Sequence, residues 1–131
     1  MKLQYKQQKF QEDAAKSVCD VFIGQPYNRT QFLSQIVSQD VDGVYSIGYG
    51  NYPIIPKLLH NGLLHNIQSV QKQNGLEVST DLMSSPSCSI NLTIEMETGV
   101  GKTYTYIKTM YELNKRYGWS KFIIVVEINL I

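Results

Sequence analysis

The sequence predicts an α/β fold, in which a parallel βαβ unit follows a helical N-terminal region. Two segments, residues 90–96 and 122–126, have the composition of β-strands. The second is a continuous apolar run, as in strands that are buried on both faces of a parallel sheet. Between them, residues 102–117 show apolar positions at helical spacing, and Gly118 is suited to end that helix. Strand, turn, helix and strand in this order make one βαβ unit.

Two further helices are expected before this unit. Residues 10–22 carry apolar side chains at helical spacing with acidic residues in the first turn, and residues 56–73 carry a similar apolar stripe. Residues 44–52 are rich in tyrosine, glycine and β-branched residues, which favours extended structure with turns. Residues 32–37 are compatible with either a short helix or a strand. Residues 76–89 are polar and rich in serine, which indicates a surface connector.

Composition limits the classes of protein to consider. The chain has 131 residues, 43% of them hydrophobic and 18% charged, with a formal net charge of +1. This length suits one small domain, and the hydrophobic content argues against disorder. The two cysteines, Cys19 and Cys88, are expected to be reduced, buried thiols. We see neither a signal peptide nor an apolar stretch long enough for a membrane span, so a cytoplasmic location without a membrane partner is expected.

The residues with the clearest chemical potential lie between the expected strand and helix of the βαβ unit, where residues 96–103 read Met-Glu-Thr-Gly-Val-Gly-Lys-Thr. Glycines let a backbone approach a ligand closely, and successive N–H groups at a helix start converge on phosphate oxygens. Lys102 is expected to reach the β- and γ-phosphates, and the Thr103 hydroxyl to ligate Mg²⁺. The predicted loop residues are Thr98, Gly99, Val100, Gly101, Lys102 and Thr103.

This pattern is the later part of a phosphate-binding loop. Met96 stands where the strict pattern has its first glycine, which leaves Gly-x-Gly-Lys-Thr. With average residue usage, that match arises by chance in roughly 0.2% of chains of this length, so coincidence is a weak explanation. The competing interpretation is a glycine-rich turn that only joins a strand to a helix.

The same residues resemble a known family. Met96 to Thr103 resembles helicase motif I of superfamily-two motors, which tolerate a residue other than glycine where Met96 stands. The longer runs 91–98, 104–107 and 112–118 resemble the Res subunit of type III restriction-modification enzymes, as do residues 10–14 and 21–26. The resemblance extends over almost the whole chain.

The resemblance implies a partial RecA-like motor domain and a set of roles. Gln11 would correspond to the glutamine that reads adenine, and a side-chain amide suits the donor and acceptor on one adenine edge. A polar surface position on the helix is the alternative for Gln11. ATP and Mg²⁺ would be the cofactors. Double-stranded DNA and a modification (methyltransferase) subunit, which selects the recognition site, would be the partners of the complete enzyme.

Two departures from the family pattern bear on activity. Val100 replaces a threonine, with little expected effect because this position contributes mainly its backbone N–H. After Val126 the sequence departs from the family's DNA-contacting segment, so the chain resembles a truncated or fragmentary product. The carboxylate and arginines that phosphoryl transfer needs lie further on in the family. We therefore expect the ATP-binding portion of an endonuclease subunit, with no complete catalytic set, that is inactive alone.

The expected organisation is one truncated ATP-binding domain, residues 1–131. It comprises a region with the adenine-reading helix (1–26), an insertion or connector (27–89) and the βαβ unit (90–126). Two alternatives stay open. One is a different P-loop ATPase, which the sequence after the second strand would distinguish. The other is a non-enzymatic remnant or interaction module, because unpaired strand edges invite pairing with another chain.

Overall fold

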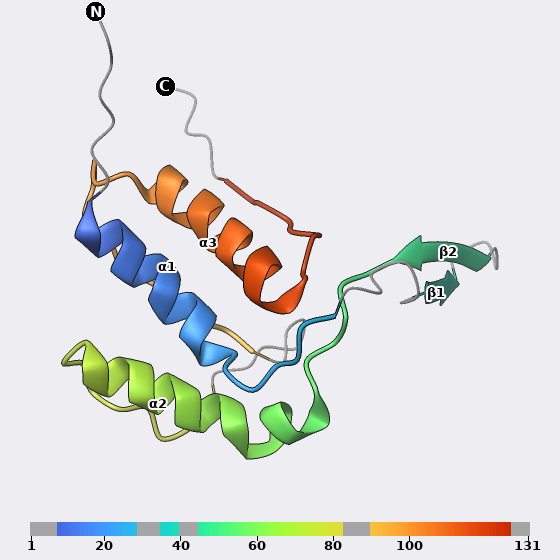
Figure 1. Cartoon of the computed structure of the whole chain (residues 1–131), viewed down its shortest axis with the longest axis horizontal. Helices are drawn as coiled ribbons and strands as arrows, with labels where there is room; N and C mark the ends of the chain where they lie inside the picture. The colour runs from blue at the N-terminus through green and yellow to red at the C-terminus, as the bar shows by residue number, and fades with distance from the viewer. Residues whose placement is uncertain (1–7, 29–34, 40–44, 83–89, 127–131) are drawn as a thin grey trace, which may run out of the picture.

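Three α-helices that lie side by side form the body of the molecule (Figure 1). The computed structural model describes residues 8–28, 35–39, 45–82 and 90–126. Helix α1 (Lys9–Val21) lies between α3 (Lys102–Tyr117) and α2 (Leu63–Gln73), and α2 is preceded by a short π-helix, η1 (Leu58–Gly62). These elements confirm the three predicted helices to within a few residues. None of the described helices is long and apolar enough to cross a membrane.

The described strands form one antiparallel hairpin. Strand β1 (Gln35–Gln39) pairs with β2 (Tyr45–Tyr49) in a register that sets Val37 opposite Ile47. The hairpin projects away from the helices (Figure 1). It agrees with the extended structure predicted for residues 44–52, and it settles β1 as a strand within the ambiguous region.

The predicted α/β fold class is wrong for the described residues. Residues 90–96 and 122–126 form no strands there, so the helix α3 is not part of a parallel βαβ unit. Both segments are largely exposed. The physical reason is that an apolar, β-branched run becomes a strand only when a neighbouring strand accepts its hydrogen bonds. No such neighbour lies beside either segment in the described part of the chain.

The core lies in two clusters on either side of the end of α1. One contains Cys19, Leu113, Tyr117 and Trp119, and the other contains Val21, Leu58 and Leu63. Phe22 and Ile54 pack against both clusters and connect them. Burial raises the pKa of the Cys19 thiol to about 11, so it stays protonated at neutral pH, as expected for a buried reduced cysteine. Cys88 lies outside the described residues.

Glycine at the end of α3 permits a close approach of two segments. Gly118 has a φ of 78° and its N–H donates to the Asn114 carbonyl oxygen at 2.8 Å. A Cβ atom at this position would lie 2.3 Å from the Asn28 carbonyl oxygen. The chain that leaves α1 can therefore pass directly against the end of α3 only because residue 118 has no side chain.

Candidate functional site: the glycine-rich turn at the start of α3

A glycine-rich turn leads directly into α3. Gly99 and Gly101 have φ angles of 79° and 86°, in the left-handed region that favours glycine. Gly101 is the N-cap of α3, which has no side-chain cap. The predicted turn and helix start are confirmed at this point. The strand predicted before the turn is absent, so the turn follows an extended segment instead.

Gln11 connects this turn to α1. Its side chain is 4% exposed, and its Nε2 donates a hydrogen bond to the Val100 carbonyl oxygen at 2.8 Å. Its Oε1 is buried without a hydrogen-bond partner among the described residues. The alternative of a polar surface position for Gln11 is therefore wrong. Burying an amide oxygen without a hydrogen bond costs stability. A hydrogen-bond donor on a bound ligand would remove that cost at Gln11 Oε1.

Gly101 lies directly against the side-chain amide of Gln11. A Cβ atom on residue 101 would lie 2.6 Å from Gln11 Nε2, so this amide, the far end of a flexible side chain, would have to move away from the Val100 carbonyl. The same test at Gly99 finds no atom within 4 Å. Glycine at residue 101 therefore permits both a positive φ angle and the close approach of the Gln11 side chain from α1. Glycine at residue 99 permits only the positive φ angle.

The start of α3 presents unpaired backbone donors. Within the described residues, the N–H groups of Gly101, Lys102 and Thr103 have no hydrogen-bond acceptor, whereas the Thr105 N–H donates to the Gly101 carbonyl at 3.0 Å. The first N–H groups of a helix, together with its dipole, attract anions. The side chains of Lys102 and Thr103 are exposed at this end. The described residues contain no group of three or more histidine, cysteine or acidic side chains that could hold a metal ion.

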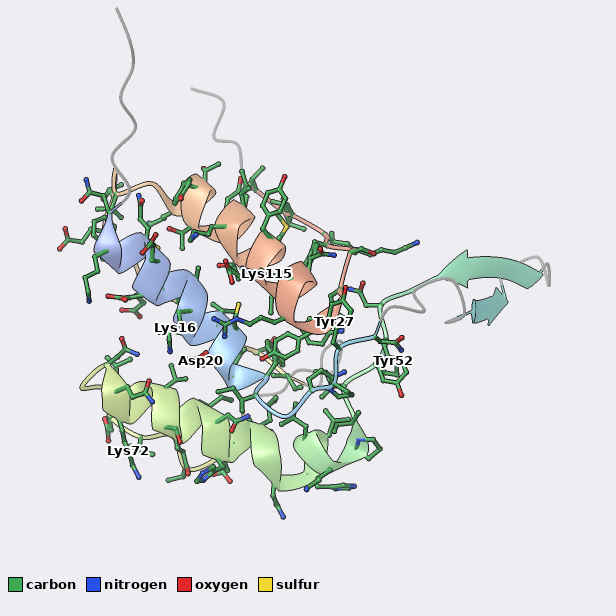
Figure 2. The ribbon with its side chains drawn as sticks, viewed as in Figure 1. Lys16, Asp20, Tyr27, Tyr52, Lys72 and Lys115 are labelled. Atoms are coloured by element: carbon green, nitrogen blue, oxygen red, sulfur yellow. The ribbon has the colours of Figure 1, made fainter. Side chains whose placement is uncertain are left out.

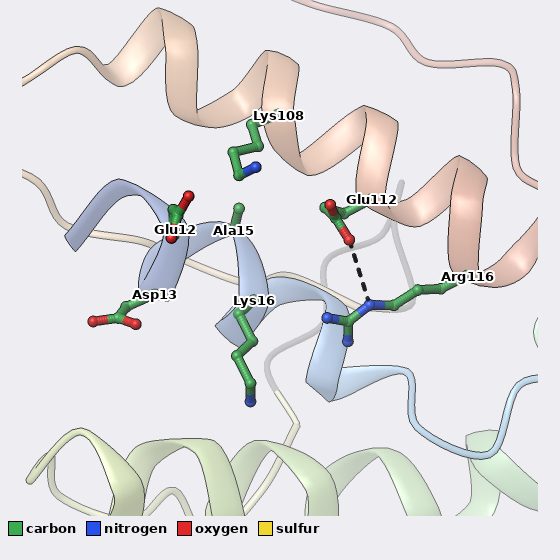
Figure 3. A pocket seen from close by; sticks show the side chains of 7 residues that line it. All are labelled: Glu12, Asp13, Ala15, Lys16, Lys108, Glu112 and Arg116. Atoms are coloured by element: carbon green, nitrogen blue, oxygen red, sulfur yellow. Dashed lines mark ion pairs between the residues drawn. The ribbon is translucent and has the colours of Figure 1, made fainter. Parts of the chain in front are cut away.

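A second polar feature lies between α1 and α3. Acidic and basic side chains, together with Ala15, line a shallow pocket there (Figure 3). The charged residues are Glu12, Asp13, Lys16, Lys108, Glu112 and Arg116. At its end, Arg116 donates to Asp20 Oδ1 at 2.8 Å and approaches Glu112 at 3.8 Å. Lys16 forms an ion pair with the other oxygen of Asp20. Figure 2 shows Lys16 and Asp20 on the side of α1 that faces the gap toward α2.

The charges around Asp20 fix its protonation state. Burial alone would raise the pKa of Asp20, but the hydrogen bonds from Lys16 and Arg116 outweigh it and hold the pKa below its ordinary value. The same contact raises the pKa of Arg116. The carboxylate is thus ionised and its two oxygens are paired, which makes this cluster a connection between helices. Apart from the spacing of Lys16 and Asp20, no local pattern indicates this cluster, because Arg116 lies 96 residues from Asp20 in the sequence.

The turn and the start of α3 together form a site of the kind that suits an anion: a helix N-terminus preceded by glycines, with the Lys102 ammonium and the Thr103 hydroxyl beside it.

Residues 61–131 match the family described as type III restriction enzyme, res subunit. The chain belongs to this family, which confirms the resemblance seen in the sequence. Residues 1–60, which include Gln11, lie outside that match.

Three relatives support the assignment. The chain is 49% identical over 70 residues to the type III restriction-modification enzyme EcoP15I Res subunit of Escherichia coli. The aligned residues make up 53% of this chain and 7% of that protein. It is 49% identical over 61 residues to the EcoPI Res subunit of Escherichia phage P1, 47% of this chain and 6% of that protein. The StyLTI Res subunit of Salmonella typhimurium is 56% identical over 36 residues, 28% of this chain and 4% of that protein. The chain thus spans less than a tenth of each relative. No solved structure matches.

Proposed function

We propose that the chain is the nucleotide-binding segment of a type III Res subunit, and that it binds Mg²⁺-ATP through the turn at the start of α3. The observation that carries the proposal is the junction of three features at one place. These are two glycines with positive φ, unpaired N–H groups at a helix start, and a buried glutamine with an unsatisfied oxygen. Membership of the Res family supports a nucleotide as the ligand.

The proposed roles follow from the chemistry of each residue. Residues 98–103 provide backbone N–H groups to phosphate oxygens, and the Lys102 ammonium adds charge near the terminal phosphates. The Thr103 hydroxyl is a suitable ligand for Mg²⁺, which prefers oxygen. Gln11 presents a side-chain amide to the adenine edge, where its Oε1 would accept a hydrogen bond from the amino group.

The proposal concerns binding without turnover. Rapid phosphoryl transfer needs a carboxylate to hold Mg²⁺ and orient water, and arginines to stabilise the transition state. None of the residues assigned to this site fills those roles. We propose that a longer Res polypeptide supplies them, and that it acts on double-stranded DNA together with a modification subunit, as the resemblance to this family implies.

Calorimetric titration with Mg²⁺-ATP tests the proposal. The Lys102→Ala variant is expected to bind at least about tenfold more weakly, because a charge-assisted hydrogen bond to phosphate is worth roughly 1.5–3 kcal/mol. Lys115→Ala, which removes the same charge from the other end of α3, is the matched control and should bind normally. Equal affinities of the wild type and Lys102→Ala would contradict the proposed site.

A second titration separates the two roles of Gln11. ATP and GTP are compared for the wild type and Gln11→Ala. If Gln11 reads adenine, the wild type prefers ATP and the variant loses that preference. If Gln11 only holds the turn through the Val100 carbonyl, both nucleotides weaken by the same factor and the ratio between them stays unchanged.

A further inference from the structure

Helices α1 and α3 lie side by side and are joined at both ends (Figure 1). At one end, Gln11 of α1 donates to the Val100 carbonyl, in the turn before α3, at 2.8 Å. At the other end, Arg116 reaches from α3 toward α1 (Figure 3) and donates to Asp20 Oδ1 at 2.8 Å. These contacts join the two starts and the two ends, so the helices run parallel. The two attachment points lie about 13 Å apart along α1.

The middle of this helix pair has small side chains. Ala15 of α1 and Thr105 and Thr109 of α3 are all buried. The two threonine hydroxyls donate to carbonyl oxygens of their own helix, those of Gly101 and Thr105. Among the described residues, no hydrogen bond or ion pair joins α1 to α3 between the two ends. Small side chains make shallow ridges, so the middle resists sliding of one helix along the other less than large interdigitated side chains would.

The strongest polar contacts therefore lie at the end that is distant from the glycine-rich turn. Asp20 receives Arg116 from α3 on one oxygen and Lys16 from α1 on the other. By contrast, the Gln11 amide has one acceptor for its Nε2 and no partner for its Oε1 among the described residues. A helix of this length moves as a rigid body, so the contact that fixes α1 along α3 at Asp20 also fixes the place of Gln11 beside the turn.

We propose that Arg116 and Asp20 are positioning residues for adenine recognition, and that they act through α1 on Gln11. Their ion pair keeps α1 at the axial position in which Gln11 Nε2 reaches the Val100 carbonyl. Without the ion pair, α1 shifts along α3, the bond to Val100 opens more often, and Oε1 loses its fixed direction. This inference rests on the proposed function, because an adenine preference requires Gln11 to contact the base, but the effect on the bond to Val100 requires no nucleotide.

Titration of the whole chain with ATP and GTP tests the effect on recognition. Arg116→Met keeps the side-chain length and removes the charge, so the preference for ATP should fall about fivefold, as for a modest coupling between two sites. Arg116→Lys keeps the charge and should retain most of the preference. Lys115→Met removes the neighbouring exposed charge and should behave like the wild type. A loss of stability alone weakens both nucleotides by one factor and leaves their ratio unchanged. A wild-type preference in Arg116→Met overturns the proposal.

Hydrogen exchange of the Gln11 side-chain amide, followed by NMR in the nucleotide-free chain, tests the positioning itself. Arg116→Met should accelerate this exchange about fivefold, because the bond to Val100 opens more often. Arg116→Lys and Lys115→Met should stay close to the wild type. Unchanged exchange in Arg116→Met overturns the proposal, whatever the chain binds. A wild type that binds no nucleotide contradicts the proposed function, and the exchange rates then still decide whether Arg116 positions Gln11.

Discussion

At the scale of single residues, the contact between Gln11 and the glycine-rich turn is the most constrained feature of the candidate site. The side chain of Gln11 crosses from α1 to the Val100 carbonyl and occupies the space where a Cβ of residue 101 would stand. A side chain at residue 101 would therefore displace the Gln11 amide from the Val100 carbonyl. The unsatisfied Oε1 shows that this arrangement is not optimised for stability alone, as is common at ligand sites.

This contact predicts an unequal effect of two similar substitutions. Gly99→Ala carries only the cost of a left-handed backbone, roughly 1–2 kcal/mol, because space is available there. Gly101→Ala carries that cost and also displaces the Gln11 amide from the Val100 carbonyl, so the lost hydrogen bond should destabilise the chain by about 1 kcal/mol more. Denaturant unfolding of both variants measures the difference.

A double-mutant cycle isolates the clash. In a Gln11→Ala background the extra cost of Gly101→Ala over Gly99→Ala should disappear, because the obstructing amide is gone. If the two glycine variants are equally stable in the wild-type background, the close approach of Gln11 does not contribute to stability.

At the scale of elements, the packing of α1 against α3 combines apolar and ionic contacts. The Tyr117 hydroxyl donates to the Cys19 carbonyl at 2.8 Å, and burial raises the pKa of that hydroxyl. Beside it, the Asp20 carboxylate receives Arg116 from α3 and Lys16 from its own helix. Trp119 adds an edge-to-face contact with Phe22 at 5.0 Å between ring centroids. The end of α1 is thus fixed to the end of α3.

The Asp20 ion pairs predict a measurable contribution to stability. Asp20→Ala should cost about 1–2 kcal/mol at neutral pH, because the Asp20 side chain is only 12% exposed and the variant leaves Arg116 with only its longer contact to Glu112. Asp13→Ala breaks the exposed pair with Lys9 in the same helix and should cost at most about 0.5 kcal/mol. Equal effects of the two variants would show that the Arg116 contact contributes no more than a surface ion pair.

The same carboxylate predicts the direction of a pH effect. The folded-state pKa of Asp20 lies below its ordinary value of 3.8, so its contribution is present above about pH 3.8 and is lost as the pH falls through the lower folded value. The difference in unfolding free energy between the wild type and Asp20→Ala should therefore stay constant from pH 7 to about pH 5 and shrink only in stronger acid. A difference that already declines near pH 6 would point to another group.

At the scale of the whole molecule, the C-terminal segment is held by a residue distant in sequence. Asn51, which lies between β2 and η1, makes three hydrogen bonds to the backbone of residues 120 and 121. Trp119 Nε1 donates to the Tyr52 carbonyl at 2.9 Å, beside this contact. The connector region thus determines where the apolar segment 122–126 leaves the body of the protein.

Asn51→Ala should therefore release this segment locally. Exchange of the Ser120 and Lys121 amide hydrogens is expected to accelerate about tenfold, with a loss of about 1 kcal/mol in global stability. Asn66→Ala, which removes two hydrogen bonds to the end of α1, is the matched control and should leave those two amides unchanged. Unaltered exchange at Ser120 and Lys121 in Asn51→Ala would mean that other contacts hold the segment.

Local sequence patterns were sufficient to predict the three helices and the glycine-rich turn. The 3.6-residue period of residues 102–117, and the glycines on either side of them, give α3 its limits because both signals act within a few residues. The same holds for α1. The sequence also indicated the family, which the comparison confirmed for residues 61–131. The residues proposed to bind nucleotide follow from that pattern and stay a prediction.

Only the tertiary structure decided the pairing of distant segments. The strand-like composition of residues 90–96 and 122–126 predicted a parallel sheet, but composition cannot supply the neighbouring strand that hydrogen bonding requires, so neither segment forms a strand in the part of the chain that the structure describes. The contacts of Gln11 with Val100, Arg116 with Asp20, and Asn51 with Lys121 join residues 89, 96 and 70 positions apart. Such contacts depend on how helices pack in space, and no local pattern encodes them.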